Sequence, residues 1–585
     1  MEGALGTVIG GLRNRWMMAV SSFFILSFAG STYIFGMYSQ TIKVNLDYDQ
    51  EVIDMLAFFK DLGLNVGIIA GLINELSCPW VVLGIGSVMN SSGYMMIWLS
   101  VTGRIARPAK WQMYLYQLIG GSSMTFINTA VIVTCVKNFP RGRGLVIGLL
   151  KGFVGLSGAI ITQIYLAANV DNPSFLILLA ATLPTTVVLI FMVFIRPIEG
   201  SPKEKNEIKN FYVFLVMALV LAGFLMVFIL LENRLHLPLA VIRIFAVITI
   251  LTIFVPLLVV IRSQLQKIKS NEATTLSDVE KSKKHEFCKE MTSYAASSQG
   301  LDSSTDYNRK DPPMEENLKS QKKWPVRGQD HTVFQALMSI DFWILFLATT
   351  CGLGSTITAI DNMGQIGKSL QYPKESISTF VSLLSIWNFL GRVGSGSISE
   401  ILMQKYSIPR PFLLSLVLAI ACVGHLLIAF GLPGSIYVAS ILIGMCFGAQ
   451  WPLMFSIISE LFGLRHFAIL YNIGQSSSPL GAYLFSVRVA GYLYDRRAKA
   501  ENVGRNNALD ELMCVGRKCF CTTFLIMAAL SMVGCAIAGL LVYRTNQFYK
   551  QDIYGKFSVE SKEDEKDASH LPCSTEISTI TSKST

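Results

Sequence analysis

Apolar segments and short polar connections alternate along most of this chain. Each apolar segment is about 20 residues long, the length of an α-helix that crosses the hydrocarbon core of a bilayer. Backbone groups in lipid must be hydrogen-bonded within the segment, so these segments are predicted to be helices. Six come first, two follow, and six close the chain: 16–38, 55–75, 80–102, 111–136, 144–167, 174–195, 211–231, 239–261, 342–367, 377–401, 412–431, 436–458, 467–493 and 522–543.

One long polar stretch interrupts this alternation, at residues 263–333. Its Lys, Glu, Ser and Asp residues offer too little apolar surface to bury a core, so the stretch is predicted to be a disordered linker. The chain is therefore divided into a first six-helix half, two extra helices, the linker, a second six-helix half and a polar tail: 1–200, 201–262, 263–333, 334–545 and 546–585.

The two halves contain an internal repeat, at an offset of about 323 residues. Gly71 and Glu75 end the second segment of the first half, and Gly396 and Glu400 end the corresponding segment of the second half. This Gly-x-x-x-Glu spacing puts a small residue and an acid one turn apart on one helix face. Glycine lets a neighbouring helix approach closely, and the carboxylate can meet the positive N-terminus of that neighbour. A single copy would also fit an ordinary helix interface.

Composition supports a membrane protein and argues against a nucleic-acid partner. Hydrophobic residues make up 52% of the chain and charged residues only 15%. The net charge of +10 comes from Lys and Arg beside the apolar segments, as at the cytoplasmic flanks of membrane helices. The even number of spans puts both termini on one side, predicted to be cytoplasmic, in the plasma membrane or an endomembrane. The connections 104–110 and 496–499 are basic and disagree with this orientation.

The repeated motif resembles that of the major facilitator superfamily, in which two six-helix halves pack around a central cavity. The segments RWMMAVSSF (15–23), GSTYIFGMYS (30–39) and FFKDLGLNVG (58–67) are similar to the plant nodulin-like branch, which includes the nuclear-fusion-defective type proteins. The resemblance implies an all-α membrane fold: a two-fold 6+6 helix bundle with two extra helices between the halves. Neither motif copy is followed directly by the usual basic residues, and the fourth span contains no Arg, so drug–proton antiport is disfavoured.

The resemblance implies a multi-pass secondary transporter that moves a small polar solute by alternating access, with an organic anion as one candidate. Transport of a polar solute requires polar groups near the membrane midplane, and such groups in a span usually face a cavity or a partner. The candidates for the substrate cavity are Asn65, Asn128, Lys151, Gln163, Asn362, Asn388, Arg392, Gln450, Trp451, Asn472 and Gln475.

Several of these candidates also have simpler interpretations. Asn65 and Asn128 fit helix–helix hydrogen bonds equally well. Lys151 can extend its amine toward the membrane surface, and Arg392 can pair with Glu400 or a loop. The cations Lys151, Arg392 and Arg488 favour an anionic organic solute, such as a carboxylate.

The rival hypothesis is a membrane receptor or scaffold that has kept the fold but transports nothing, acting in organelle or nuclear membrane fusion. The sequence contains no nucleophile elbow, HExxH or Walker pattern, so no enzymatic activity, cofactor or metal site is predicted. The expected partners are the lipid bilayer and a small solute, and the expected functional unit is a monomer.

Cys514 and Cys519 lie in and just after the connection between the last two spans. The two sulfurs can meet if the chain turns between them, because a disulfide needs Cα atoms within about 7 Å. The alternative is that Cys519 is an apolar residue opening a helix and Cys514 is a free thiol.

Overall fold

The computed structural model describes residues 14–48, 50–65, 67–168, 174–198, 207–234, 238–262, 325–494, 496–497 and 514–550. Nearly all of the predicted linker and the predicted tail lie outside these residues. Every regular element within them is helical, and eleven of the helices are long and apolar enough to cross a membrane. The prediction of an all-α membrane protein is confirmed.

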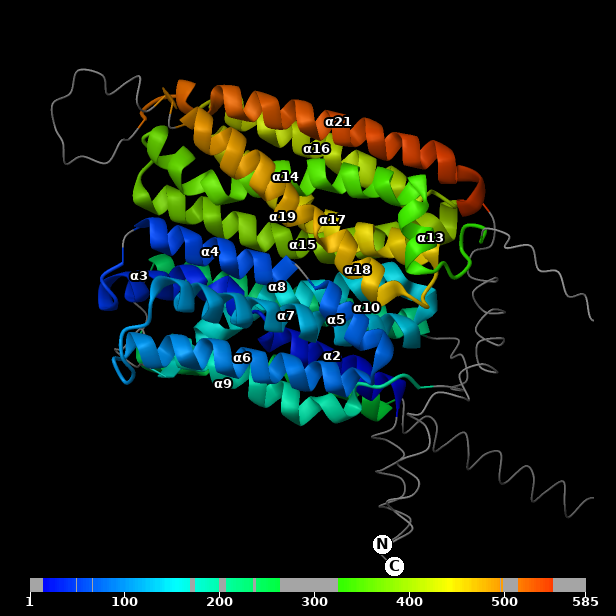
Figure 1. The fold of residues 1–585 in the computed structure, drawn as a ribbon, viewed down its shortest axis with the longest axis horizontal. Coiled ribbons are helices and arrows are strands. Elements are labelled where there is room, and N and C mark those ends of the chain that lie inside the picture. Colours follow the sequence, from blue (N-terminus) through cyan, green and yellow to red (C-terminus); the bar gives the residue numbers. More distant parts are fainter. Residues whose placement is uncertain are drawn as a thin grey trace, which may run out of the picture.

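The first half and the two extra helices form one group of elements, the lower group in Figure 1. In chain order they are α2 (Arg15–Phe28), η1 (Ser31–Ile34), α3 (Phe35–Asn45), α4 (Gln50–Asn65), α5 (Ile68–Leu76), α6 (Pro79–Val101), α7 (Lys110–Asn138), η2 (Pro140–Gly142), α8 (Arg143–Ala168), α9 (Ser174–Phe191), η3 (Met192–Phe194), α10 (Glu207–Arg234) and α11 (Leu239–Phe254).

The second half forms the other group, and the long helices of both groups run along the long axis of the molecule (Figure 1). Its elements are α13 (Val333–Met338), α14 (Ile340–Ser369), α15 (Lys374–Tyr406), α16 (Arg410–Phe430), α17 (Ser435–Phe462), α18 (Phe467–Gln475), α19 (Ser477–Gly481), the π-helix η4 (Ala482–Gly491) and α21 (Lys518–Tyr549).

Four of the predicted spans are not continuous helices, which corrects the sequence-based expectation. In the span 239–261, α11 ends at Phe254 and a turn follows at residues 255–256. The span 16–38 is divided into α2, η1 and α3, and the span 55–75 into α4 and α5. The span 467–493 is divided into α18, α19 and η4. Gly30 and Gly67 stand directly before η1 and α5. A Cβ added to Gly67 would lie 2.2 Å from Asn472 Oδ1 of α18, so the chain at this break packs too closely against the second half for a larger residue. Hydropathy alone does not reveal such breaks.

The extra helix α10 packs against the first half through an aromatic cluster. The Trp16 ring lies 5.2 Å from Phe139 and 5.4 Å from Phe211, measured between centroids. Arg15 and Glu207 form an ion pair at 3.9 Å beside this cluster. These large buried rings contribute much apolar contact area, so they fix the position of α10 on the first half.

The two ends of the bundle are distinguished by landmark residues. The motif end is the end that contains Glu75, Glu400 and His466, and it lies at the right in Figure 1, near α13 and α18. The disulfide end is the opposite end, where Cys514 and Cys519 are joined with a Cα–Cα distance of 5.9 Å. The Gly516 N–H donates to Ser369 O there, which ties the start of α21 to the end of α14.

Candidate functional site

The second copy of the motif, Gly396 and Glu400 on α15, contacts α8 of the first half. A Cβ added to Gly396 would lie 2.4 Å from Gly144 O and 2.9 Å from Gly148 Cα. Only glycine permits so close a contact between the two backbones. The Gly144 N–H, in the first turn of α8, donates to Glu400 Oε2 at 3.2 Å, where the helix dipole favours a negative charge.

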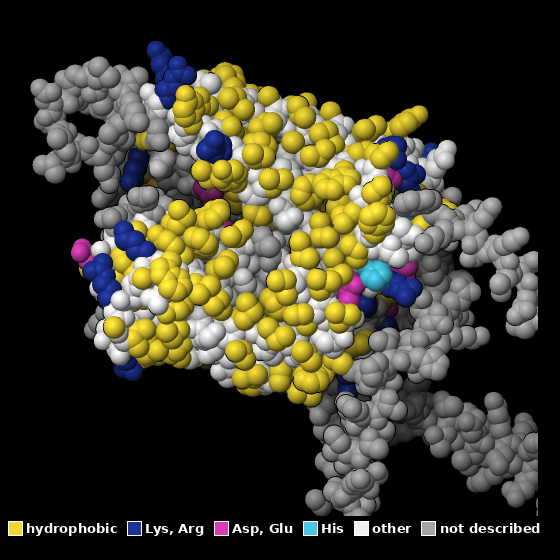
Figure 2. All heavy atoms as spheres, in the orientation of Figure 1, with side chains coloured by type: hydrophobic (Ala, Val, Ile, Leu, Met, Phe, Trp, Pro, Cys, Tyr) yellow, Lys and Arg dark blue, Asp and Glu magenta, His cyan; other side chains and the backbone are white. Residues whose placement is uncertain are grey.

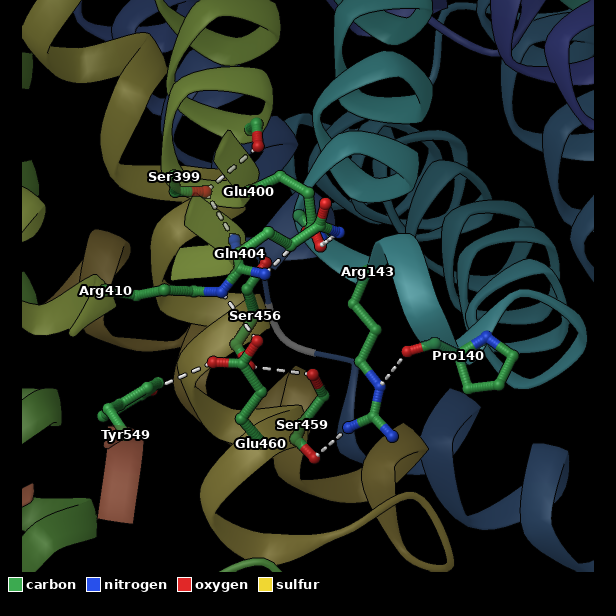
Figure 3. A network of polar contacts seen from close by, with 12 residues as sticks. Pro140, Arg143, Ser399, Glu400, Gln404, Arg410, Ser456, Ser459, Glu460 and Tyr549 are labelled. Atoms are coloured by element: carbon green, nitrogen blue, oxygen red, sulfur yellow. Dashed lines mark hydrogen bonds and ion pairs between the residues drawn. The ribbon is translucent and has the colours of Figure 1, made fainter. Parts of the chain in front are cut away.

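A buried network holds Glu400 within the second half (Figure 3). Arg410 of α16 donates to Glu400 Oε2 at 2.7 Å and to Glu460 Oε1 of α17 at 2.6 Å. Tyr549 of α21 donates to Glu460 Oε2 at 2.9 Å. The side chains of Arg410, Glu400 and Glu460 are fully buried. Charges removed from water need such complete pairing, so the network joins α15, α16, α17 and α21 tightly.

The first copy of the motif, Gly71 and Glu75 on α5, contacts the start of α18 in the second half. A Cβ added to Gly71 would lie 2.8 Å from Ala468 O and 2.9 Å from Ile469 Cα. Glu75 Oε2 lies 2.7 Å from His466 Nδ1, and the Ile469 N–H donates to Glu75 Oε1 at 3.4 Å. The His466 side chain is 28% exposed. Both copies of the motif therefore join the two halves at the motif end.

A loop before α13 covers the motif end of α17. Asp330 Oδ1 accepts hydrogen bonds from the N–H groups of Leu464 and Arg465, at 2.8 and 3.0 Å. The His331 ring packs edge-on against Phe462, and its burial lowers the pKa of His331. These contacts fix the loop that leads from α17 into α18.

Lys151 lies at the centre of an aromatic cage between the two halves. Its side chain projects from α8 of the first half and is almost completely buried. Lys151 Nζ lies 5.0, 5.3 and 5.7 Å from the ring centroids of Phe455, Tyr471 and Trp451, which belong to α17 and α18 of the second half. Ring faces attract a cation electrostatically. Among the described residues, no carboxylate forms an ion pair with Lys151.

Arg392 of α15 lies beside this cage. It donates to Asn388 Oδ1 at 2.9 Å and to Lys151 O at 3.0 Å. It therefore contacts α8 of the other half, while Glu400 pairs with Arg410 instead. A Cβ added to Gly155, one turn along α8 from Lys151, would meet only Arg392 Nη1, at 3.8 Å. Arg392 is therefore in ordinary contact distance of this part of α8, with room for a small side chain at Gly155.

Two further candidates also connect the halves. Asn472 of α18 donates to Thr129 Oγ1 at 3.0 Å, and Gln475 donates to Leu64 O at 2.8 Å. Leu64 O lies at the end of α4, just before the break that separates α4 from α5. The break removes the N–H group that would bond to this carbonyl within a continuous helix, and Gln475 donates to it instead. The interruptions of the spans 55–75 and 467–493 therefore meet one another. Interrupted helices of this kind line the binding sites of many transporters.

The remaining candidates lie away from the cage contacts or bond within their own half. Asn65 donates to Asp61 O and Asn362 to Thr358 O, each within one helix. Gln450 donates to Cys446 O and lies against Gly352 of α14, inside the second half. The side-chain oxygens of Asn128 and Gln163 are buried without a donor among the described residues.

The disulfide end is hollow between the halves, and acidic side chains are visible within the hollow in Figure 2. Asp361 is exposed although it lies well inside α14. It interacts electrostatically with Lys60 and Asp61 of α4, in the opposite half. Lys60 and Asp61 form an ion pair at 3.1 Å. Charged groups within a span need water or a partner, so they are consistent with a hollow that water enters.

Several residues of this arrangement do not stand out in the sequence. Glu460 and Arg410 lie just outside the predicted spans, so hydropathy does not mark them as groups within the membrane. Phe455 and Tyr471 look like the other apolar residues of their segments. The spacing of Trp451 and Phe455, one turn apart on α17, is the signal that could have linked them.

Comparisons with known proteins agree with this arrangement. Residues 15–261 match the Nodulin-like family, and residues 329–551 match the family described as NFD4, C-terminal domain. The chain is 26% identical over 577 residues to the Arabidopsis thaliana protein NUCLEAR FUSION DEFECTIVE 4, covering 95% of this chain and 93% of that protein. It is 25% identical over 273 residues to the probable transporter mch1 of Neurospora crassa, covering 40% of this chain and 44% of that protein.

A solved structure with a similar fold is that of the major facilitator superfamily proton:xylose symporter XylE. It is 11% identical, with a TM-score of 0.50, and the match covers 91% of this chain and 95% of that one. At this identity the likeness concerns the fold alone.

Proposed function

The chain matches the Nodulin-like family and has the fold of major facilitator superfamily transporters, and on this premise we propose that it is a secondary transporter of a small organic anion. The observation that carries the proposal is Lys151, a cation buried between the halves in a cage of aromatic rings. A buried charge is costly without a counter-charge. A solute anion that enters between the halves would supply it.

The proposed mechanism is alternating access, in which the halves rock about the region of Lys151. The motif end is closed by the contacts of Gly71, Glu75, Gly396 and Glu400 with the opposite half. The disulfide end carries a hollow between the halves in which acidic side chains are visible (Figure 2). These two features support a state that admits solute from the disulfide end. Closing that end and opening the motif end would release the solute on the other side.

The protein is an integral multi-pass membrane protein, and its orientation is part of the proposal. The basic residues near the motif end, such as Arg143, Arg410 and Arg465, favour a cytoplasmic motif end. The disulfide end then faces an oxidising compartment, which is compatible with the bond between Cys514 and Cys519. We propose a functional monomer that is driven by a proton or solute gradient.

The proposal is tested by uptake of labelled organic anions into vesicles reconstituted with the full chain. The variants Lys151→Gln and Arg392→Gln each remove one charge beside the cage and are expected to reduce uptake at least tenfold. The control Lys405→Gln removes an exposed charge at the motif end of α15 and should leave uptake unchanged. Unchanged uptake of every transported anion in both cage variants would refute the proposed anion site.

The alternative function is a receptor or scaffold without transport activity, which the name of the Arabidopsis relative brings into consideration. The same vesicles distinguish the two functions if they are incubated with a mixture of cellular metabolites and analysed by mass spectrometry. Accumulation of a solute that requires Lys151 supports transport. A complete lack of protein-dependent accumulation in either direction favours the scaffold.

A further inference from the structure

We infer that the cage binds the carboxylate group of the solute through two donors, Lys151 Nζ and Trp451 Nε1. The inference rests on the proposed transport of an organic anion and specifies its chemical class. It also makes Trp451 a residue that determines specificity, beyond its contribution to the aromatic wall.

The indole N–H of Trp451 is a buried donor in need of an acceptor. The Trp451 side chain is 7% exposed, and Nε1 has no hydrogen-bond acceptor among the described residues. A buried donor without an acceptor is destabilising, so such groups in native proteins call for an explanation. An oxygen atom of the bound solute would be the missing acceptor for the Trp451 N–H.

The two donors belong to one cage. Lys151 Nζ lies 5.7 Å from the centroid of the Trp451 ring, and Nε1 is an atom of that ring system, so we infer that one carboxylate reaches both. Each carboxylate oxygen accepts charge-assisted hydrogen bonds of about 2.8 Å, so its two oxygens can bridge the pair. The N–H also lies on the electropositive edge of the indole, which attracts an anion.

The cage favours a planar carboxylate over a tetrahedral oxyanion. Phe455 and Tyr471 complete the walls around Lys151, so the surroundings of the two donors are mostly aromatic. Phosphate or sulfate would bring additional charged oxygens against these rings, where their desolvation is costly.

The test uses vesicles containing the full chain and labelled glycolate, malonate, succinate, citrate, phosphate and sulfate. Trp451→Phe keeps an aromatic wall but removes the N–H, and Trp451→His restores a ring N–H. The control Trp343→Phe removes an indole N–H that donates to Leu337 O at 2.7 Å, outside the cage. Size-exclusion profiles establish that each variant is folded.

The wild type is expected to transport at least one carboxylate, with neither phosphate nor sulfate transported or inhibitory. Trp451→Phe should raise the KM for that carboxylate about tenfold or more, the effect of losing a hydrogen bond to a charged group. Trp451→His should recover part of this loss, and Trp343→Phe should match the wild type.

Three results would overturn the inference, and they separate it from the proposed function. If Lys151→Gln abolishes carboxylate uptake but Trp451→Phe does not alter KM, the anion site stands and the second donor is wrong. If phosphate or sulfate is transported in place of carboxylates, the anion site stands and the substrate class is wrong. This wild-type selectivity decides the class even if the Trp451 variants do not fold. If no anion is transported, the proposed function itself fails.

Discussion

The two copies of the Gly-x-x-x-Glu motif differ in where their carboxylates are held. Glu400 pairs with Arg410 inside its own half and meets the other half at the Gly144 N–H. Glu75 instead reaches directly across to His466 and Ile469 of the opposite half. The Arg410 network is fully buried, whereas the Glu75 contact is partly exposed.

Because of this difference, we expect the two copies of the motif to have different roles. Opening the motif end would leave the pair between Glu400 and Arg410 intact, because all its members move with the second half. The pair between Glu75 and His466 would have to separate. We therefore expect the second copy to contribute mainly to the stability of its half, and the first copy to contribute mainly to the equilibrium between conformations.

Removal of Arg410 should have the largest effect. Arg410→Ala leaves Glu400 and Glu460 buried without their counter-charge, which costs on the order of 3–5 kcal/mol. Unfolding of the purified protein in detergent measures this loss. Arg465→Ala removes an exposed arginine near the same end and is expected to change stability little. Comparable stability of the two variants would contradict the importance of the network.

Substitution of Gly396 should have an intermediate effect, on conformation rather than on folding. Gly396→Ala places a methyl group against the backbone of α8, and overpacking of this kind costs about 1–3 kcal/mol. Because separation of the helices relieves the clash, the motif end should open. Alkylation of a cysteine introduced at the α8–α15 contact measures the opening.

Gly394 provides the matched control, because it lies on the same helix and a Cβ there would meet nothing within 4 Å. Gly394→Ala should leave the alkylation rate unchanged. If both alanine variants open the motif end equally, a loss of glycine in α15 explains the effect and close packing against α8 does not.

Substitution of Glu75 should have the smallest effect. Glu75→Gln removes the carboxylate charge that meets His466 Nδ1 and the Ile469 N–H, and a partly exposed pair of this kind contributes about 1 kcal/mol or less. The variant should therefore open the motif end more often than the wild type, as reported by the same alkylation assay, with little change in the stability measured by unfolding.

His466→Gln removes the partner of Glu75 and is the second arm of this experiment. An alkylation rate that stays at the wild-type value in both variants would show that this contact does not hold the motif end closed. His331 and Asp330 lie on the neighbouring loop, so an Asp330→Asn variant identifies their contribution. Arg465 is the charged residue next to His466 and should be retained in every variant.

The sequence predicted the helical class, the positions of most spans and the repeated motif, because these depend on local hydropathy and spacing. It did not predict the breaks near Gly30 and Gly67, which hydropathy does not register. It also did not predict the pair of Arg410 with Glu460, since that depends on how α16 and α17 are rotated about their axes. The sequence identifies Lys151 as a candidate for the cavity. It does not identify the aromatic side chains around Lys151, because they belong to helices distant in sequence.

Rocking of the halves between two arrangements is measured most directly as distances between spin labels. One label pair replaces Leu76 and Tyr406 at the motif end, and another replaces Val44 and Tyr492 at the disulfide end. All four side chains are exposed, and each pair has one member in each half. Pulsed electron resonance on reconstituted protein, with and without a transported solute, gives both distance distributions.

The rocking mechanism predicts two conformations of the protein. In one of them the distance between the labels at the motif end is longer and the distance at the disulfide end is shorter than in the other. Gly396→Ala should shift both distributions toward the open motif end, while Gly394→Ala should not. A single unchanging distance at each end, under all solute conditions and in both variants, would contradict the rocking mechanism.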